Sequence, residues 1–464
     1  MFIGRKKELA KLNEMYYNDS FEFAVIYGRR RIGKTTLIRE FCKDKKAIYF
    51  IAREANDLIN IENFSKDVFS VTSIESADTA KFPNWEKAFD YVYKVAKNER
   101  IIVVIDEYPY LAQANRSISS SLQAHIDMKF KNSKLFLILC GSSMSFMEYQ
   151  VLGYKSPLYG RRTAQFKIKP FTFFESIRYH KNFTNEEKAI IFGITGGIPE
   201  YLSKIKDGKS LKFNIIDMFL SENGHLYEEP ASLLKQELRE PGTYNSIITA
   251  IAKGSSKLNE IATKCGMDSN KCAKYLTSLI SIGIIRKDKP LNDENGRKSI
   301  YVIEDNMFKF WYRFVPDNMT HIVSGNPDIL YIKVIEPQIS TYMGPIFEEI
   351  CIQYLIKHNY TNTLPIMFGK IGRWWGGNPT LKKQEEIDIM ATDNYESAIF
   401  GECKWTKDQV DVSVLDNLIR RGDLFSYKNK YYYIFSKTGF TDDCIEKAKK
   451  NSNVKLIAFS DMID

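Results

Sequence analysis

Runs of consecutive apolar residues alternate with amphipathic patterns over roughly the first third of the chain. Helical patterns such as TTLIREFCK and WEKAFDYVYKVAK separate the runs. Because the runs are apolar throughout, both faces of the sheet they form should be buried. This rhythm predicts an α/β domain over residues 1–171, with a parallel sheet covered by helices. The expected strands are FEFAVIYG (21–28), AIYFIA (47–52), IIVVIDE (101–107), KLFLILCGSS (134–143) and TAQFKIKPF (163–171).

The pattern changes after residue 171. Residues 172–229 contain short helical stretches such as NEEKAIIFGIT, which predict a helical lid subdomain attached to the sheet. Residues 230–305 contain three helical patterns and then two strands around the polar turn NDENGRK. Three helices followed by a two-stranded ribbon are typical of a winged helix-turn-helix, in which Gly266 closes the second helix.

Residues 306–464 predict a further α/β unit. A helical pattern, IFEEICIQYLIK, precedes a glycine-rich stretch, GRWWGGNP, which we interpret as a break between elements. Two strands follow, EEIDIMA and SAIFGECKW, and then a helix, a third strand YYYIF, and a last helix and strand. The four predicted domains are 1–171, 172–229, 230–305 and 306–464.

The composition is typical of a protein with several folded domains and bears on where in the cell we expect it. The chain has 464 residues, about three times a usual domain, with 44% hydrophobic and 27% charged residues. A net charge of +9 permits a polyanionic partner without requiring one. The 7 cysteines include no CxxC pair, and the longest apolar runs are too short for a membrane span. We therefore expect a cytoplasmic protein with no membrane partner.

The sharpest motif is GRRRIGKTTL, which lies between a predicted strand and a predicted helix. Its spacing is GxxxxGK[ST], in which backbone amides wrap phosphates, Lys34 adds positive charge, and the Thr35 hydroxyl binds Mg²⁺. A chance glycine turn is the alternative. The motif predicts binding of ATP with Mg²⁺ by the loop residues Gly28, Arg29, Arg30, Arg31, Ile32, Gly33, Lys34, Thr35 and Thr36.

Polar residues follow two other predicted strands. Asp106 and Glu107 end IIVVI, where a doubly wound sheet places its ligand chemistry. We expect Asp106 to hold the metal through water and Glu107 to orient or deprotonate the attacking water. Ser142 ends KLFLILC and is expected to sense the γ-phosphate, with a plain turn as the alternative.

Two further segments carry weaker signals. Arg161 and Arg162 lie in a loop before the last strand, where one of them would neutralise transition-state charge in its own chain or in a neighbour. A solvated basic loop is the alternative. Pro199 in TGGIPEYL begins a helix and would press a rigid backbone against the base, unless it is an ordinary N-terminal proline.

In this order, the motifs FIGRKKEL, GRRRIGKTTL, VVIDEYPYL, CGSSM, LYGRR and TGGIPEYL make the chain resemble the archaeal-type ATPases, on the AAA+/STAND side of the P-loop proteins. The resemblance covers the whole chain. It implies that residues 2–5 help to seat the adenine and that Pro199 senses it. It also implies a C-terminal domain with the PD-(D/E)xK (restriction-endonuclease-like) fold.

The predicted winged helix offers candidate contacts for DNA. Its third helix carries Asn270, Lys271, Lys274 and Tyr275, types that meet phosphates and base edges. The alternative is an internal module that couples the ATPase to the C-terminal domain. The wing has five basic residues against three acidic ones, a weak phosphate footprint: Arg286, Lys287, Lys289, Arg297 and Lys298 against Asp288, Asp293 and Glu294.

The C-terminal unit contains a second group of candidate residues. Glu402 and Lys404 are separated by one residue, so they face the same side of a strand, and a hairpin puts Asp388 beside them. Such a set suits metal-assisted phosphodiester hydrolysis, with Asp388 and Glu402 as ligands and Lys404 activating water. Glu348 on the preceding helix would complete the metal shell. The alternative is a surface sheet with salt bridges, and EID here replaces the proline–aspartate of the fold's name.

Together these features predict a Mg²⁺-dependent ATPase that acts through its winged helix on double-stranded DNA. Whether the protein also cleaves DNA with a metal ion is left open by the sequence. The alternative is a nucleotide-dependent switch or scaffold whose inactive nuclease-like domain binds protein or DNA. The sequence leaves open whether the protein forms a homo-oligomer.

Overall fold

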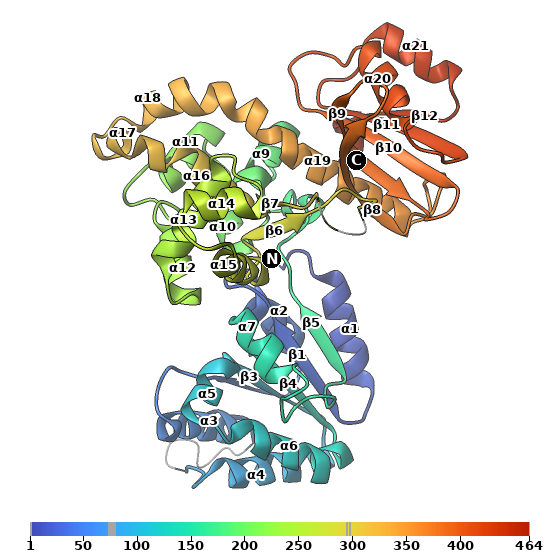
Figure 1. Ribbon diagram of the computed structural model, residues 1–464. Coiled ribbons are helices and arrows are strands. Elements are labelled where there is room, and N and C mark those ends of the chain that lie inside the picture. Colours follow the sequence, from blue (N-terminus) through green and yellow to red (C-terminus); the bar gives the residue numbers. More distant parts are fainter. Residues whose placement is uncertain (1, 73–79, 294–295, 297, 464) are drawn as a thin grey trace. The chain divides into compact units, whose positions relative to one another are not determined.

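The computed structural model describes residues 2–72, 80–293, 296 and 298–463. The chain divides into two compact units (Figure 1). The first unit contains residues 1–171 together with 198–200, and the second contains 172–197 together with 201–464. Each unit is described by itself.

The first unit is built on a parallel sheet in the order β2-β3-β4-β1-β5. Every residue of β1, β3 and β4 is buried, as their continuous apolar runs predict. Because all strands run the same way, their carboxyl ends share one edge of the sheet. The strands are β1 Glu22–Tyr27, β2 Ala47–Ile51, β3 Ile101–Asp106, β4 Leu135–Gly141 and β5 Ala164–Lys167.

Helices cover both faces of this sheet. On one face the Phe41 ring of α2 lies 5.3 Å from the Phe136 ring of β4. On the other face the rings of Phe64 and Trp85 lie 5.4 and 6.1 Å from Phe50 of β2. The helices are α1 Lys6–Tyr17, α2 Lys34–Cys42, α3 Asp57–Thr72, α4 Trp85–Asn98, α5 Tyr108–Ala114, α6 Ile118–Met128 and α7 Met144–Phe146, with the short turns η1 Phe130–Asn132 and η2 Met147–Val151.

The second unit begins with helices that pack into its own core. The Tyr342 hydroxyl of α19 donates to the carbonyls of Gly193 on α9 (2.6 Å) and Asn306 on α16 (3.0 Å). A Cβ at Gly193 would lie 2.8 Å from the Met343 sulfur, so α9 packs closely on α19. Residues 172–197 therefore lie in the second unit together with residues 201–464, and their attachment to the ATPase domain stays a prediction. The helices are α8 Phe173–Ser176, α9 Asn185–Thr195, α11 Leu211–Phe219, α12 Glu229–Glu237, α16 Asn306–Phe314, η3 Pro316–Asn318, α17 Met319–Val323, α18 Pro327–Leu330, η4 Tyr331–Ile335 and α19 Glu336–Tyr360. The helix α10 Pro199–Lys204 begins in the first unit and continues into the second.

Residues 241–303 form three helices and an antiparallel ribbon, in the order that the sequence predicts. They are α13 Pro241–Ala252, α14 Leu258–Lys264, α15 Ser269–Ser281, β6 Ile285–Asp288 and β7 Ile300–Ile303. Gly266 has a φ of 61°, the left-handed conformation that the turn after α14 requires. Beyond β6, the Leu291 amide donates to the Arg373 carbonyl (3.0 Å). Leu291 and Trp374 both pack against the core of the C-terminal sheet, so the ribbon's loop is docked there.

The C-terminal sheet has the order β12-β11-β10-β9-β8. β8, β9 and β10 are antiparallel, and β10, β11 and β12 are parallel. Residues 372–378 lie inside β8, so the glycine-rich stretch is a strand and not the expected break. Asp388 lies within β9 rather than at its end. The elements are β8 Lys370–Asn378, β9 Lys383–Thr392, β10 Ser397–Lys404, α20 Val412–Gly422, β11 Asn429–Ser436, α21 Asp442–Lys450, β12 Val454–Ala458 and η5 Ser460–Met462.

The two faces of the C-terminal sheet have different helix covers. Leu415 and Leu418 of α20 pack with Phe400 and Ile434 on one face. The Tyr354 ring of α19 lies 6.1 Å from Phe435 on the other face. Alternation along β10 therefore directs Glu402 and Lys404, like Phe400, toward α20.

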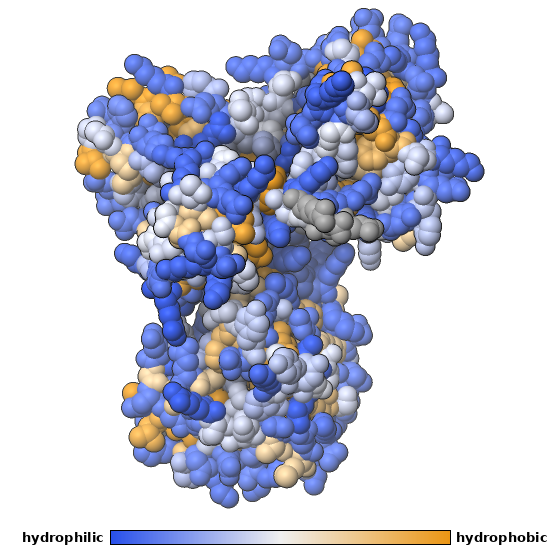
Figure 2. Space-filling model, viewed as in Figure 1, coloured by the Kyte–Doolittle hydropathy of each residue, from blue (hydrophilic) through white to orange (hydrophobic). Residues whose placement is uncertain are grey.

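The surface is largely hydrophilic on the face in Figure 2, with hydrophobic residues gathered over α17 and α18. Val323, Ile329 and Ile332 are 61%, 48% and 51% exposed in this region. Within the residues that the structure describes, the helices are too short or too polar to cross a membrane.

Candidate functional site

The loop between β1 and α2 needs its glycines. Gly28 has a φ of 155°, and a Cβ there would lie 2.4 Å from the Ile168 carbonyl oxygen. Gly33 has a φ of 83° and precedes the first residue of α2, Lys34. Side chains at these positions would strain the backbone or collide with it, so the glycines let the loop turn tightly into the helix.

Lys34 is folded into this loop. Its ammonium group donates to the carbonyls of Gly28 (2.8 Å) and Arg29 (3.0 Å), and the residue is buried. A buried cation at a helix N-terminus, surrounded by loop backbone, is suited to an anionic ligand. The loop therefore has the charge and shape that phosphate binding requires.

Asp106 is held at the end of β3 by three donors. Its Oδ2 accepts from the hydroxyls of Thr35 (3.1 Å) and Tyr49 (2.7 Å), and its Oδ1 accepts from the Glu107 amide (2.9 Å). A hydroxyl and a carboxylate in contact beside the loop are the oxygen ligands that Mg²⁺ takes in nucleotide sites. Thr35 and Asp106 thus fit the predicted magnesium site.

Glu107 and Ser142 lie together at the same edge of the sheet. The Ser142 hydroxyl donates to both carboxylate oxygens of Glu107, at 3.0 and 2.9 Å. Glu107 has a φ of 52°, which is rare for a residue with a side chain and marks a constrained backbone. The residue predicted to sense the γ-phosphate therefore contacts the predicted water-activating acid.

The remaining predicted residues of the loop have structural partners. Arg30 donates to the Tyr110 hydroxyl (3.1 Å), and the Arg31 carbonyl accepts from the Glu200 amide (3.3 Å). Ile32 is buried, whereas Thr36 is exposed. Pro199 stands beside the loop, with its Cγ 3.6 Å from the position of a Cβ on Gly33. The Pro199 segment and the loop thus form one surface within the first unit.

The N-terminal segment is tied to the same loop through Arg5. Its guanidinium donates to the Ile32 carbonyl (3.1 Å) and to the Lys169 carbonyl, and lies 4.5 Å from the centre of the Phe171 ring. Arg5 is 5% exposed. This arrangement positions the segment that the family resemblance assigns to adenine next to the phosphate loop.

Arg161 and Arg162 lie elsewhere. They precede β5, so they are at the amino-terminal edge of the sheet, whereas the phosphate loop is at the carboxyl edge. Arg161 pairs with both carboxylate oxygens of Asp127 on α6: Nε donates to Oδ1 (3.1 Å) and Nη2 donates to Oδ2 (2.6 Å). The structure does not bring either arginine to the nucleotide loop of its own chain.

The exposed face of α15 carries three of the four residues predicted to contact DNA. Asn270, Lys271 and Lys274 are exposed, whereas Tyr275 is half-buried and donates to Glu240. In the ribbon Arg286 pairs with Asp288 (3.4 Å). Two residues of the predicted wing, Glu294 and Arg297, lie outside the described residues.

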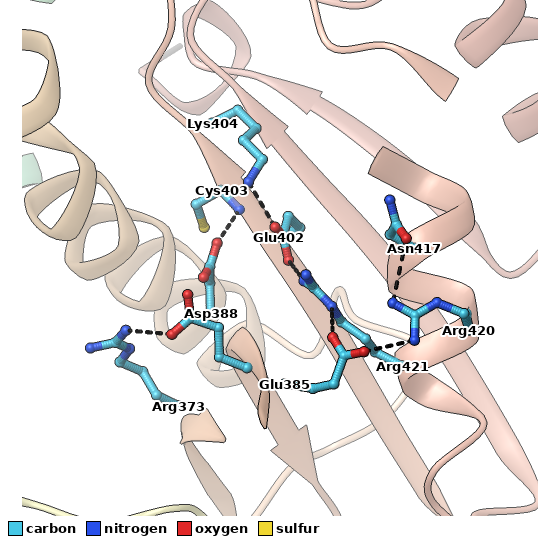
Figure 3. A network of polar contacts seen from close by, with 10 residues as sticks. Arg373, Glu385, Asp388, Glu402, Cys403, Lys404, Asn417, Arg420 and Arg421 are labelled. Atoms are coloured by element: carbon cyan, nitrogen blue, oxygen red, sulfur yellow. Dashed lines mark hydrogen bonds and ion pairs between the residues drawn. The ribbon is translucent and has the colours of Figure 1, made fainter. Parts of the chain in front are cut away.

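Asp388, Glu402 and Lys404 meet in the C-terminal sheet (Figure 3). The Asp388 carboxylate accepts from the amide of Cys403 (2.8 Å), the residue between the other two. Lys404 donates to Glu402 (2.7 Å). Burial, with the charges of Glu402 and Glu348, raises the pKa of Asp388 to about 7. Burial opposes the charge of Lys404, but Glu402 outweighs it and raises the lysine pKa.

A second set of ion pairs closes this site, and no sequence motif indicated it. Arg421 of α20 joins Glu402 (2.9 Å) to Glu385 (3.1 Å), and Arg420 also pairs with Glu385 (2.8 Å) (Figure 3). The hydrogen bond from Arg420 is the main cause that lowers the Glu385 pKa to about 2. In the sequence, the signal for these ion pairs is the presence of two adjacent arginines, Arg420 and Arg421, in the last turn of the amphipathic helix α20.

The predicted metal shell of Glu348, Asp388 and Glu402 is not assembled in this arrangement. Glu402 is engaged by Lys404 and Arg421, and Glu348 is paired with Arg373 (3.2 Å). No group of three His, Cys, Asp or Glu side chains in the described parts of the chain is placed to hold a metal ion. Glu348 and Glu402 are thus paired with neighbouring cations, whereas Asp388 accepts from the Cys403 amide, and the metal shell stays a prediction.

Comparisons with known proteins identify an ATPase domain that includes the phosphate loop and extends beyond the first unit. Residues 2–205 match a family described as an ATPase domain predominantly from Archaea, and residues 311–415 match archaeal and bacterial proteins of unknown function. The Walker-type ATPase paby2304 of Pyrococcus abyssi has a similar fold, with a TM-score of 0.51 and 20% identity, covering 67% of this chain and 96% of that one.

Sequence relatives come from Methanocaldococcus jannaschii. The uncharacterized ATP-binding protein MJ0423 is 44% identical over 46 residues, 10% of this chain and 78% of that one. The uncharacterized protein MJECL04 is 36% identical over 447 residues, 94% of this chain and 96% of that one. With a full-length relative and a matching ATPase domain that contains the phosphate loop, the chain belongs to the archaeal-type ATPases.

Proposed function

We propose that the first unit binds ATP with Mg²⁺ at the loop of residues 28–36 and hydrolyses it. The observation that carries this proposal is the meeting of Lys34, the Thr35–Asp106 pair and the Glu107–Ser142 pair at one edge of the sheet. When bound, Mg²⁺ would neutralise negative charge on the phosphates, so that water attacks the γ-phosphorus more easily. Thr35 and Asp106 are the residues that would hold it.

Glu107 is the proposed base for the attacking water. Ser142 fixes the Glu107 carboxylate through hydrogen bonds to both oxygens, so contact of the Ser142 hydroxyl with a γ-phosphate would release or turn it. Residues 2–5 and Pro199 border the loop and are proposed to receive the adenine. Arg161 and Arg162 are proposed to act only on the nucleotide of a neighbouring copy, since their own loop is at the other edge.

Removal of the Lys34 charge tests the nucleotide site. Lys34→Ala should weaken ATP binding by roughly 10- to 100-fold, the effect of losing a charge-assisted hydrogen bond to phosphate. Lys46→Ala is the matched control, because Lys46 forms an exposed ion pair with Glu99 in the same unit. Equal ATP affinity in wild type and Lys34→Ala would reject the assignment.

For the second unit we propose a winged helix, residues 241–303, that binds double-stranded DNA through α15. Asn270, Lys271 and Lys274 are exposed on one helix, which suits contact with phosphates. The docked loop at Leu291 supports a different use for the wing, which would couple this module to the C-terminal sheet. The two uses are compatible because they involve different elements.

Charge reversal on α15 tests the DNA proposal. Lys271→Glu with Lys274→Glu should weaken duplex binding at all sequences and reduce the salt slope by about one unit for each phosphate that the variant no longer neutralises. Charge reversal at Lys43 and Lys97 in the first unit is the control for net charge. Unchanged affinity and slope would leave coupling as the sole role of the winged helix.

We propose that the C-terminal sheet, with its preceding helix α19, has the nuclease-like fold and acts as a metal-free platform. The ion pairs on Glu402 and Glu348 support this proposal. Metal-dependent DNA cleavage is the second candidate, favoured by Asp388 lying against the Cys403 amide. Nicking of plasmid DNA with Mg²⁺ or Mn²⁺, abolished by Asp388→Ala and Lys404→Ala but kept in Lys34→Ala, would replace the platform by a nuclease.

A further inference from the structure

Tyr49 touches the nucleotide site from a strand that no motif marks. It lies on β2, at the edge of the sheet, and its hydroxyl donates to Asp106 Oδ2 at 2.7 Å. The residues are 57 positions apart in the sequence, and β2 pairs with β3 in parallel so that Ile51 is opposite Asp106. The contact is therefore a product of strand pairing.

The hydroxyl completes a set of donors on one carboxylate. Oδ2 of Asp106 receives Tyr49 and the Thr35 hydroxyl (3.1 Å), and Oδ1 receives the Glu107 amide (2.9 Å). Asp106 is 3% exposed, so these donors substitute for water. A buried carboxylate fixed from three directions keeps one orientation.

A neighbouring side chain fixes the Tyr49 ring. The Arg39 guanidinium of α2 lies 5.8 Å from the centre of the Tyr49 ring and packs against it. The ring is thus held in place, with its hydroxyl directed at Asp106.

We propose that Tyr49 is a positioning residue for the magnesium site. It holds Asp106 so that the Thr35 proton points at the carboxylate, which leaves the Thr35 lone pairs for the cation. This inference rests on the proposed function of the loop at residues 28–36. Tyr49 itself touches neither nucleotide nor metal, so its loss should alter the Mg²⁺ requirement more than the chemical step.

The test compares Tyr49→Phe with wild type in a Mg²⁺ titration of fluorescent ATP binding to the full chain. The Mg²⁺ concentration at half-effect should rise by roughly 10- to 100-fold, as for other residues that orient metal ligands. Nucleotide affinity without Mg²⁺ should stay the same, and turnover at saturating Mg²⁺ should recover to within a few-fold. Tyr91→Phe, which loses a hydroxyl contact with Thr72 away from the nucleotide site, is the matched control.

The outcomes separate this inference from the function beneath it. A Mg²⁺ midpoint in Tyr49→Phe equal to that of wild type overturns the positioning role and leaves the ATPase site intact. A weakening of nucleotide binding that is the same with and without Mg²⁺ also overturns it, because the effect would then be structural. Wild-type nucleotide binding that ignores Mg²⁺ contradicts the proposed function itself.

Discussion

At the scale of single residues, the sequence predicted the residues of the phosphate loop but not the distant residues that contact the candidate sites. Gly28, Gly33 and Lys34 follow from a local spacing whose backbone geometry is fixed by neighbouring residues. Tyr49 is 57 positions from Asp106, and Arg421 is 36 positions from Glu385. Such contacts depend on which strands and helices become neighbours in the fold. An apolar run such as AIYFIA, which contains Tyr49, does not indicate its neighbours.

Glu107→Gln separates nucleotide binding from hydrolysis. Glutamine keeps the shape and a hydrogen-bond acceptor for Ser142 but cannot take a proton from water. ATP binding should therefore stay near wild type, while turnover should fall by roughly 10²- to 10⁴-fold. Equilibrium binding and steady-state hydrolysis measure the two effects. Hydrolysis at the wild-type rate would remove Glu107 from the mechanism.

Lys309 of α16 predicts a pH dependence of stability. Burial lowers its pKa to about 8, against about 10.4 for an unfolded lysine. Between these values the unfolded state binds more protons, so the free energy of unfolding should rise with pH. Below pH 8 both states are protonated and the effect is constant.

The measurement is the thermal midpoint of wild type relative to Lys309→Met at several pH values. The thermal midpoint of wild type minus that of Lys309→Met should increase between pH 8 and pH 10. The same difference should not change between pH 6 and pH 7. A difference that falls with rising pH would mean that Lys309 is not buried as a destabilised cation.

At the scale of elements, continuous apolar runs were sufficient to predict strands that are buried on both faces of a sheet. β1, β3 and β4 are buried on both faces, and their runs predicted them. β8 was missed because its glycines and polar residues suit an edge strand, whose stability comes from pairing with β9. The packing of α9 on α19 could not be predicted, since helical periodicity shows that a face is buried but does not identify the element that covers it.

Leu291→Asp tests the docking of the ribbon on the C-terminal sheet. The substitution places a charge against apolar partners, which should destabilise the docked state by roughly 1–3 kcal/mol. Hydrogen exchange of the β6 and β7 amides should then accelerate. Lys289→Asp changes an exposed side chain of the same loop and should leave exchange unchanged. Equal protection in both variants would show that the ribbon is stable without its dock.

At the scale of the whole molecule, the chain passes between the two units at residues 171–172, 197–198 and 200–201. The short Pro199 segment contacts the phosphate loop, while the helical residues on either side of it belong to the second unit. This covalent continuity is compatible with the sequence-based expectation of a relay in which the ATPase acts through the winged helix on DNA.

The most direct test of this relay is the rate of ATP hydrolysis by the full chain with Mg²⁺, measured with and without saturating duplex DNA. We expect hydrolysis above the Lys34→Ala background and a several-fold change of rate on adding DNA. The Lys271→Glu, Lys274→Glu variant should keep the basal rate and lose the response. A wild-type rate that is the same with and without DNA would contradict the coupling, and a rate no higher than that of Lys34→Ala would contradict the ATPase site.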